Sequence, residues 1–309
     1  MFHHFHDEYK NPKYQGSINK DQLYKIIKYI GKNNILNADE FQIRLKEAKL
    51  KPNNVCFTFD DGLKSQYDIA LPLLEDLKIK SFFFVYTSIF DEIPDFLEIY
   101  RYFRVVYYEN VDSFYKDFFY NSNIDLKKFF DSNTKKLEKT LKNFPFYSLN
   151  DAKFRILRDF GISKKKYHSI MIQMFRNKKF NYKKITKKLF ITTNQFKTIH
   201  KLGHYIGLHS HTHPTLIENL DFKKQYSEYK KNLLNIKKIL NYDVNIKFMS
   251  HPNGSYNKNT LKILKELNLE LGFRSSMIVD KTKKMKKINN SKYEIAREDH
   301  SNIIYKMNE

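Results

Sequence analysis

The sequence has no tryptophan and a single cysteine, Cys56, among its 309 residues. One cysteine excludes an intrachain disulfide framework and a cysteine-built zinc site, so a bound metal would have to rely on histidine and carboxylate ligands. No uninterrupted apolar run reaches the roughly 18 residues that a membrane-spanning helix needs. The first residues, MFHHFHDEYK, also lack the apolar core of a signal peptide. We therefore expect a cytoplasmic protein.

Acidic residues are scarce relative to basic ones, with 34 Asp and Glu against 56 Lys and Arg and a formal net charge of +22. Such an excess favours anionic surroundings, among them phosphorylated substrates, acidic lipid headgroups and nucleic acid. A strongly AT-biased genome would produce a similar composition without selection for any partner. Hydrophobic residues make up 41% of the chain, which is enough for a buried core and indicates a globular protein.

Short apolar runs alternate with helical patterns, which predicts parallel strand pairing in an α/β fold. The expected strands are 1–5, 55–59, 81–86, 205–208, 246–249, 271–274 and 293–297. The expected helices are 22–30, a short one capped by Asn37, 69–77, 222–240 and 259–267. Residues 95–201 are rich in Lys, Phe, Tyr and Asn and mostly helical in period, so we expect them to form an insertion within a single domain covering residues 1–309. The basic run 281–287 is expected to be a solvated loop.

Ionisable residues follow three of these strands, in FTFDDG at 57–62, IGLHSHTHP at 206–214 and MSHPNGSY at 249–256. In α/β barrels the active site gathers at the carboxyl ends of the strands, so the three segments are expected to meet. Taken alone, the pair of Asp60 and Asp61 favours a structural interpretation, in which the two residues cap the following helix.

Three histidines alternate with other residues at His209, His211 and His213. The outer two converge on one ion if the chain turns helically, whereas an extended chain would align all three. The alternative is an exposed polar loop whose histidines have no role. One carboxylate and two imidazoles leave open positions on a divalent ion, which is the arrangement that a hydrolytic metal site needs.

The order of these motifs resembles that of the polysaccharide deacetylase family (NodB homology, carbohydrate esterase 4). The resemblance rests on TFDDG at 58–62, the following apolar helix, the FFFV strand, and H-S-x-x-H at 209–213 ahead of Pro214. It implies a distorted TIM-like (β/α) barrel of the NodB-homology type, carrying a largely helical insertion in this chain.

The resemblance also implies roles for individual residues. By motif position, Asp60 matches the general base, and Asp61, His209 and His213 match the metal ligands, with Zn²⁺ expected and Co²⁺ or Ni²⁺ as alternatives. His211 falls at a variable position of the family.

The third segment departs from the family's common Arg-Pro-Pro-Tyr-Gly pattern, because Ser250 replaces the Arg and Asn253 replaces the Tyr. A main-chain N–H near Asn253 would still help to hold an oxyanion, since that donor does not depend on the side chain. His251 is either a local polar contact or merely a loop residue. Arg297 and Asp299, with Glu298 between them, are candidates to steady the Asp60 base in place of the missing arginine.

The family's usual Leu-x-x-His, which supplies the general acid, is not evident near the C-terminus, where His300 stands in the wrong context. Some relatives, including poly-N-acetylglucosamine deacetylases, carry this acid on an early strand reading roughly Tyr-His-Arg, and MFHHF at 1–5 resembles that segment. On this alignment His3 is the acid. His4 is the runner-up and would face the other way on a strand.

The expected function is metal-dependent removal of an N-acetyl group from a sugar or glycan intermediate in surface-polysaccharide biosynthesis. A cytoplasmic location and the +22 charge favour an N-acetylated carbohydrate linked to a nucleotide or lipid carrier, with peripheral contact to an anionic membrane as a further option; nucleic acid is not expected as the partner. One alternative is hydrolysis of another C–N bond, in a formamide or cyclic amide, on the same fold. The other is a catalytically silent binding protein with a basic surface.

Overall fold

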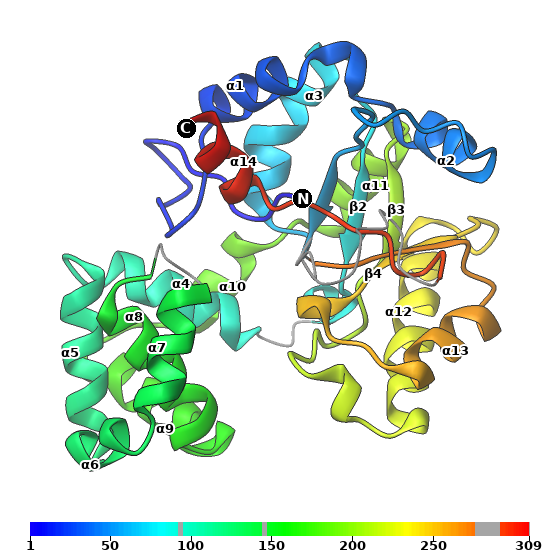
Figure 1. Ribbon diagram of the computed structural model, residues 1–309. Helices are drawn as coiled ribbons and strands as arrows, with labels where there is room; N and C mark the ends of the chain where they lie inside the picture. The colour runs from blue at the N-terminus through cyan, green and yellow to red at the C-terminus, as the bar shows by residue number, and fades with distance from the viewer. Residues whose placement is uncertain (92–94, 144–146, 276–290, 309) are drawn as a thin grey trace. The chain divides into compact units, whose positions relative to one another are not determined.

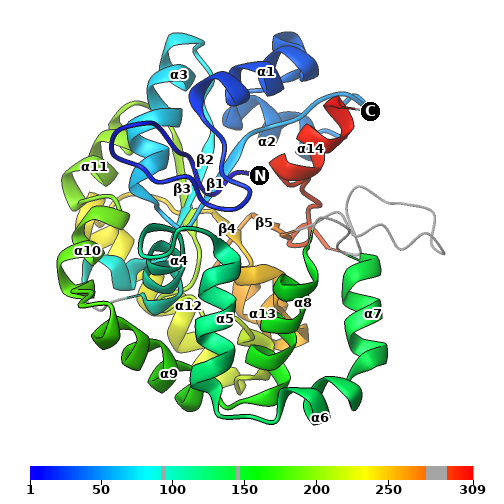
Figure 2. The ribbon, with the colours of Figure 1, turned by 90° about the vertical axis from the view of Figure 1, so that its left-hand side faces the viewer.

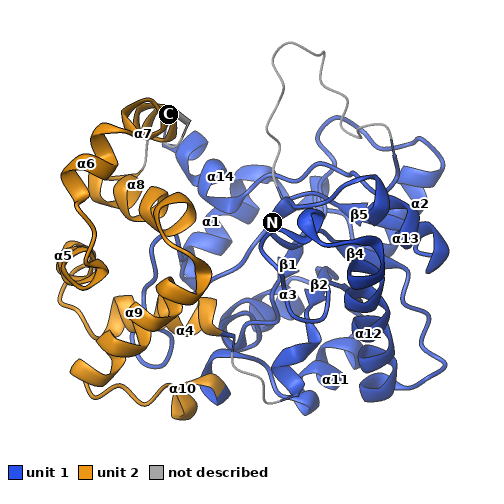
Figure 3. Cartoon of the chain, turned by 90° about the horizontal axis from the view of Figure 1, so that it is seen from below, with its two compact units in different colours: residues 1–95, 187–309 blue, residues 96–186 orange. Residues whose placement is uncertain are grey.

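The computed structural model describes residues 1–91, 95–143, 147–275 and 291–308, and the chain divides into two compact units (Figure 3). The first unit comprises residues 1–95 and 187–309, and the second comprises residues 96–186. The helical unit is thus shorter than the expected insertion of residues 95–201. Residues 187–201, the last part of the expected insertion, belong to the first unit because α11 (Thr193–Lys201) packs against α12 (Phe222–Leu240).

A parallel sheet of five strands forms the centre of the first unit, and its strands lie side by side in chain order. They are β1 (Thr58–Asp60), β2 (Phe82–Val85), β3 (Tyr205–Leu208), β4 (Phe248–Ser250) and β5 (Leu271–Phe273). The five strands curl into a half-barrel, which confirms the predicted α/β barrel class. Because the strands are parallel, their carboxyl ends share one edge of the sheet.

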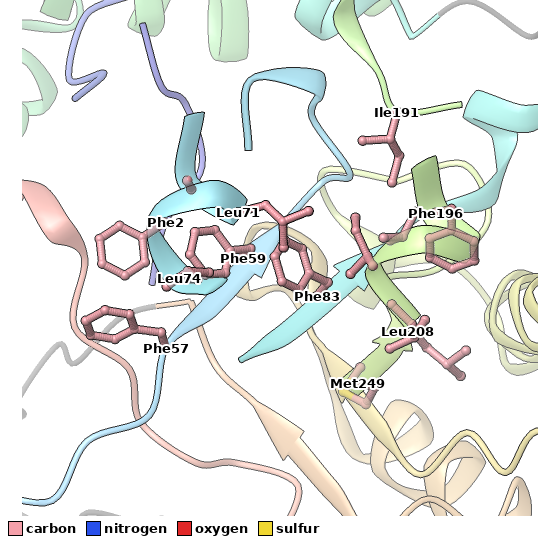
Figure 4. Packing of buried hydrophobic residues seen from close by; sticks show 14 of the residues in the cluster. Phe2, Phe57, Phe59, Leu71, Leu74, Phe83, Ile191, Phe196, Leu208 and Met249 are labelled. Carbon is pink, nitrogen blue, oxygen red and sulfur yellow. The ribbon is translucent and has the colours of Figure 1, made fainter. Parts of the chain in front are cut away.

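Aromatic and aliphatic side chains from neighbouring segments form a hydrophobic core against the sheet (Figure 4). The rings of Phe59 and Phe83 are stacked with centroids 4.7 Å apart, and Phe2 stacks on Phe59 at 5.2 Å. All residues of β1, β2, β4 and β5 are buried. Strands buried on both faces read as continuous apolar runs, which is why VCFTF and SFFFV were recognisable in the sequence.

Helices surround the strands of this unit (Figures 1 and 2). They include α1 (Lys20–Ile30), α2 (Ala38–Lys46), α3 (Leu71–Asp76), α11, α12, α13 (Lys258–Glu266) and α14 (His300–Met307). Asn37 precedes α2 as predicted, but its side chain does not cap that helix; its Oδ1 accepts the main-chain N–H of Lys80 at 2.7 Å. The segment expected as one helix at 69–77 begins instead as a π-helical turn, Gln66–Ala70, and continues into α3 with Pro72 in the first turn.

Two expected strands, 1–5 and 293–297, pair with the sheet through single bridges and are not strands. Phe2 bridges Phe59 at one edge, and Ile295 bridges Phe273 at the other. Each bridge consists of two main-chain hydrogen bonds, after which the chain leaves the sheet. The two segments still flank the sheet, and the N-terminus lies beside the segment leading into α14 (Figure 1). The expected basic loop at 281–287 lies outside the described residues.

The described secondary-structure elements of the second unit are all helices. It contains α4 (Phe96–Val106), α5 (Val111–Ser122), α6 (Leu126–Asp131), α7 (Thr134–Asn143), α8 (Leu149–Ile156), α9 (Lys164–Asn177) and the start of α10 (Tyr182–Leu189). Its core is aromatic: Phe118 packs edge-on against Phe154 with ring centroids 4.9 Å apart, and Phe103 packs against Phe175 at 4.6 Å. Within the described parts of both units, no helix combines the length and apolar character required to cross a membrane.

Candidate metal and catalytic site

Two adjacent carboxylates lie at the carboxyl edge of the sheet, on Asp60, the last residue of β1, and on Asp61 in the turn that follows. Asp61 has φ +80°, and its main-chain N–H donates to the carbonyl of Phe84 at 3.0 Å. Gly62 follows with φ +66°, and a Cβ at this position would lie 2.9 Å from a methyl group of Val85. A side chain is therefore disfavoured at residue 62 by both the backbone conformation and the available space.

Asp61, His209 and His213 lie together as the motif predicted. Asp61 Oδ1 is 3.2 Å from His209 Nε2 and 3.3 Å from His213 Nε2, and the three groups offer ligand atoms that all lie within 4.8 Å of one another. Among the described residues this buried Asp61 oxygen has no hydrogen-bond partner. A buried, unsatisfied carboxylate oxygen facing two imidazole nitrogens fits a divalent cation such as Zn²⁺, which takes oxygen and nitrogen ligands of this kind.

The other ring nitrogen of His209 fixes which nitrogen faces Asp61. Nδ1 lies 2.9 Å from the carbonyl oxygen of Ser250, and a carbonyl only accepts hydrogen bonds, so Nδ1 carries the proton. Nε2 of the neutral ring therefore directs its lone pair toward Asp61, as a metal ligand requires. Burial disfavours the charged form of His209, but the Asp60 and Asp61 carboxylates outweigh it and raise the pKa of this histidine.

The loop carrying the histidines is neither a continuous helix nor an extended strand. Ser210 and His213 adopt left-handed conformations, with φ of +63° and +53°, and the ring centroids of His209 and His213 lie 4.9 Å apart. The His211 ring lies elsewhere, with its Nδ1 3.0 Å from Thr87 Oγ1. The structure thus groups the outer two histidines with Asp61 and leaves the middle one out of this group.

Asp60, the predicted base, is held by Arg297. Guanidinium Nη1 and Nη2 donate to Asp60 Oδ1 and Oδ2, each at 2.7 Å. Ser250 Oγ accepts from Arg297 Nη2 at 2.7 Å and donates to Asp60 Oδ2 at 3.1 Å. Burial opposes ionisation of Asp60, but the guanidinium outweighs it and holds the pKa of this carboxyl well below its usual range. An arginine from a different segment thus contacts the aspartate, and the serine at the family's arginine position takes part in the same contact.

His3, the predicted acid, lies beside the same aspartate. Its Nε2 is 3.9 Å from Asp60 Oδ2, and its Nδ1 is 4.0 Å from Asp299 Oδ2. The His3 side chain is 28% exposed, so one side of the ring faces solvent. Burial lowers the pKa of His3 to about 4, although the surrounding carboxylates act in the opposite direction.

The two other candidate acids have buried rings with other contacts, although His300 Nδ1 lies 3.7 Å from Asp299 Oδ1. The His4 ring is buried and packs on Tyr14 with centroids 5.0 Å apart. His300 is also buried, and its Nε2 lies 2.7 Å from the Gly16 carbonyl. Glu298 directs its carboxylate along α14, where it accepts from Asn302 at 2.7 Å. Of the histidines considered as the acid, His3 alone is within 4 Å of Asp60 in the described residues.

The loop after β4 contains Asn253 and His251. Asn253 is exposed and has φ +51° within the turn Pro252–Gly254. Among the described residues, the Asn253 side chain makes no hydrogen bond to Asp60 or to the group of Asp61, His209 and His213. His251 is a buried structural residue: its Nε2 lies 2.8 Å from the Tyr293 carbonyl, and its ring stacks on Tyr256 at 4.3 Å.

Sequence reasoning missed Glu228 and Asn232, two residues of α12 that bind the main chain of the histidine loop. No motif marks them, because a single Glu or Asn in a Lys-rich amphipathic helix reads as part of its solvated face. Only the burial of Asn232, which is complete, distinguishes it, and burial is not visible in the sequence.

The structure thus defines an α/β half-barrel protein with a candidate metal site, formed by an Asp-His-His group beside a second buried aspartate at the carboxyl edge of the sheet. The sequence comparison agrees, because residues 47–163 and 167–272 match the polysaccharide deacetylase family. The chain belongs to that family, as the motif order indicated.

Solved structures show the same fold at low sequence identity. The Streptococcus pyogenes deacetylase PplD in complex with acetate is 17% identical, with a TM-score of 0.51 over 96% of this chain and 89% of that one. IcaB from Ammonifex degensii is 13% identical, with a TM-score of 0.53 over 96% and 88%. The de-N-acetylase from Aggregatibacter actinomycetemcomitans is 13% identical, with a TM-score of 0.53 over 97% and 93%. Comparison of the sequence with curated proteins finds no match.

Proposed function

We propose that this chain is a metal-dependent amide hydrolase that removes the N-acetyl group from a sugar or glycan intermediate of surface-polysaccharide biosynthesis. The observation that carries the proposal is the Asp61, His209 and His213 group, whose first two members are buried. It lies directly beside Asp60, which Arg297 holds in its ionised form. A structural or binding protein has no need of this combination, since buried carboxylates and imidazoles are costly unless they have a role or a partner.

Asp61, His209 and His213 would hold the metal, with Zn²⁺ expected and Co²⁺ or Ni²⁺ as alternatives. When bound, such an ion supplies Lewis-acid chemistry at neutral pH, polarising a carbonyl oxygen and making a water acidic. The chain's contribution is to fix the ligand geometry. His209 contributes through its Nδ1–H bond to the Ser250 carbonyl, which keeps Nε2 free to bind.

Asp60 would accept the proton of the attacking water. Arg297 and Ser250 occupy one side of the carboxylate, and they fix its orientation relative to the adjacent Asp61. A base must lie within hydrogen-bond reach of the proton that it takes, so this fixed orientation serves the reaction directly. Main-chain N–H groups near Asn253 would stabilise the developing oxyanion.

His3 would deliver a proton to the departing amine nitrogen. Because burial lowers its pKa to about 4, the ring is neutral before the reaction and has to receive a proton first. Asp60 Oδ2, 3.9 Å from His3 Nε2, is the nearest group that gains one during the attack. The proton taken from water would thus pass from Asp60 through His3 to the amine, and Asp299 on the other side of the ring would favour its charged form.

The substrate would carry phosphate, through a nucleotide or a lipid carrier. The helical unit of residues 96–186 contains 20 Lys and Arg against 9 Asp and Glu, which is half of the chain's formal net charge of +22. Concentrated positive charge raises the local concentration of an anionic substrate. A carrier-linked sugar intermediate is a cytoplasmic or membrane-surface species, and we propose the same location for this protein.

The test is a calorimetric titration of the metal-stripped protein with Zn²⁺, followed by assay of acetate release from N-acetyl sugars and from their diphosphate-linked forms. A single tight site that disappears in the His209→Ala, His213→Ala double variant is the expected result. No specific site in a folded wild-type protein would overturn the hydrolase and favour a binding protein. Equal turnover of neutral and diphosphate-linked sugars would overturn the carrier proposal alone.

A further inference from the structure

Two polar side chains on one face of α12 bind the loop that carries the histidine ligands. Glu228 and Asn232 lie four residues apart, which places them one above the other on the helix. Glu228 Oε2 accepts the main-chain N–H groups of His211 and Thr212, at 3.0 and 2.8 Å, and its Oε1 accepts the Thr212 hydroxyl at 2.8 Å. One carboxylate thus holds the middle of the loop at three points.

Asn232 binds the start of the same loop and the end of the neighbouring strand. It is completely buried, and its Oδ1 accepts the main-chain N–H of His209 at 2.9 Å. Its Nδ2 donates to the Val85 carbonyl at 3.0 Å and to Thr87 Oγ1 at 3.2 Å. The same Thr87 hydroxyl meets the His211 ring at 3.0 Å, so His211 belongs to this network.

The loop needs such support because its backbone is strained. Ser210 and His213 both have positive φ, which costs of the order of 1 kcal/mol or more for a residue with a side chain and persists only where the surroundings enforce it. This strain turns the chain so that His209 and His213 face Asp61 while His211 faces the other way. Side chains of α12 accept hydrogen bonds from the main-chain N–H groups of His209, His211 and Thr212. The first of these residues is a proposed ligand, and the other two lie between the two proposed ligands.

We propose that Glu228 and Asn232 are positioning residues, which set the separation of the His209 and His213 imidazoles for the metal without touching it. The inference rests on the proposed metal site. A purely structural role would change the stability of the metal-free protein and leave its intrinsic metal affinity unaltered. Supports of this kind around metal ligands are typically worth 10–100-fold in affinity.

The experiment compares Glu228→Leu and Thr212→Val with the wild type, using the full chain stripped of metal and titrated with Zn²⁺. The leucine has no acceptor for the main-chain N–H groups of His211 and Thr212 or for the Thr212 hydroxyl. Thr212→Val removes only the hydroxyl contact. Glu266→Leu is the matched control, because the polar contact that Glu266 on α13 makes within the described residues is an ion pair with Lys262 at 3.9 Å.

We expect Glu228→Leu to bind Zn²⁺ at least about 10-fold more weakly, Thr212→Val to lose about 2- to 5-fold, and Glu266→Leu to match the wild type. The visible spectrum of the Co²⁺-loaded Glu228→Leu protein should also differ from that of the wild type, because that spectrum reports ligand geometry. Wild-type affinity and spectrum in Glu228→Leu would overturn the positioning role and leave the proposed function intact. If Glu228→Leu does not fold, wild-type Zn²⁺ affinity in Thr212→Val would overturn the positioning role. No Zn²⁺ site in the wild type itself would overturn the proposed function.

Discussion

Arg297 holds both carboxylate oxygens of Asp60, although 237 residues separate the two in the chain. Both side chains are buried, with exposed fractions of 4% and 2%. Breaking a buried ion pair from one side leaves an uncompensated charge, so we expect Arg297→Met to lower the free energy of unfolding by about 3–5 kcal/mol. Urea denaturation of the metal-free protein measures this. Arg44→Met, which breaks a partly exposed pair with Glu40, should cost less than about 1 kcal/mol.

An arginine at residue 250 should take over the contact with Asp60 when Arg297 is removed. Ser250 Oγ lies 3.1 Å from Asp60 Oδ2, and the family resemblance places an arginine at this position. The Ser250→Arg, Arg297→Ser double variant should therefore recover at least half of the stability lost in Arg297→Ser alone, as measured by the same urea titration. A double variant no more stable than Arg297→Ser would show that the two positions are not equivalent.

Zn²⁺ should raise the melting temperature only when Asp61 can bind it. A ligand that binds the native state at 100 times its Kd adds about 2.7 kcal/mol to stability. Asp61→Asn keeps the shape of the side chain and tolerates the φ of +80°, since Asn is among the few residues that adopt left-handed conformations. We expect this variant to fold and to lose most of the Zn²⁺-dependent shift in differential scanning calorimetry. A full shift in Asp61→Asn would remove this residue from the ligand set.

His3→Gln should depress turnover while leaving substrate binding nearly unchanged. A positioned proton donor contributes about 10²–10⁴-fold to a rate, which is the expected loss in kcat for acetate release. His4→Gln is the neighbouring control, because the His4 ring packs on Tyr14 and its loss should affect stability more than kcat. Wild-type kcat in His3→Gln would assign the acid to another group.

Acid should destabilise the fold through His251. Its Nε2–H donates to the Tyr293 carbonyl, its buried Nδ1 has no partner among the described residues, and burial lowers its pKa to about 3. As the pH falls from about 6.5 toward 3, the unfolded chain binds a proton that the native protein does not, so stability falls by up to about 1.4 kcal/mol per pH unit. His251→Gln keeps a donor near the Tyr293 carbonyl and does not titrate. Urea unfolding between pH 7.5 and 4.5 should show a shallower slope for this variant, and an unchanged slope would contradict the assignment.

The sequence predicted those parts of the molecule that depend on local pattern. The strand at 205–208 and the helix at 222–240 have the predicted bounds, because continuous apolar runs and a 3.6-residue period are local properties. The family resemblance supplied the grouping of Asp61 with His209 and His213, because the spacing of the histidines alone left open whether two or three of them converge.

Features that depend on contacts between distant segments of the chain were harder to predict from the sequence. Sequence named Arg297 only as one of three neighbouring candidates, and its two-point contact with Asp60 requires both sheet edges to be in place. The Asn37 side chain is a second example, because a cap position is visible in sequence while the competing N–H of Lys80, 43 residues away, is not. The left-handed turns at Ser210 and His213 likewise follow from tertiary contacts and not from residue type.

The insertion of residues 96–186 between β2 and β3 has a consequence for how the protein folds. Phe82 pairs directly with Tyr205, so the centre of the sheet cannot form until the two ends of the intervening helical unit come together. Loop closure costs chain entropy that grows with loop length, and local helical contacts form faster than distant strand pairs. The helical unit is a compact unit of its own, so it would shorten that loop by folding first. The insertion thus ties formation of the centre of the sheet to closure of this loop, because β2 and β3 cannot pair until its two ends meet.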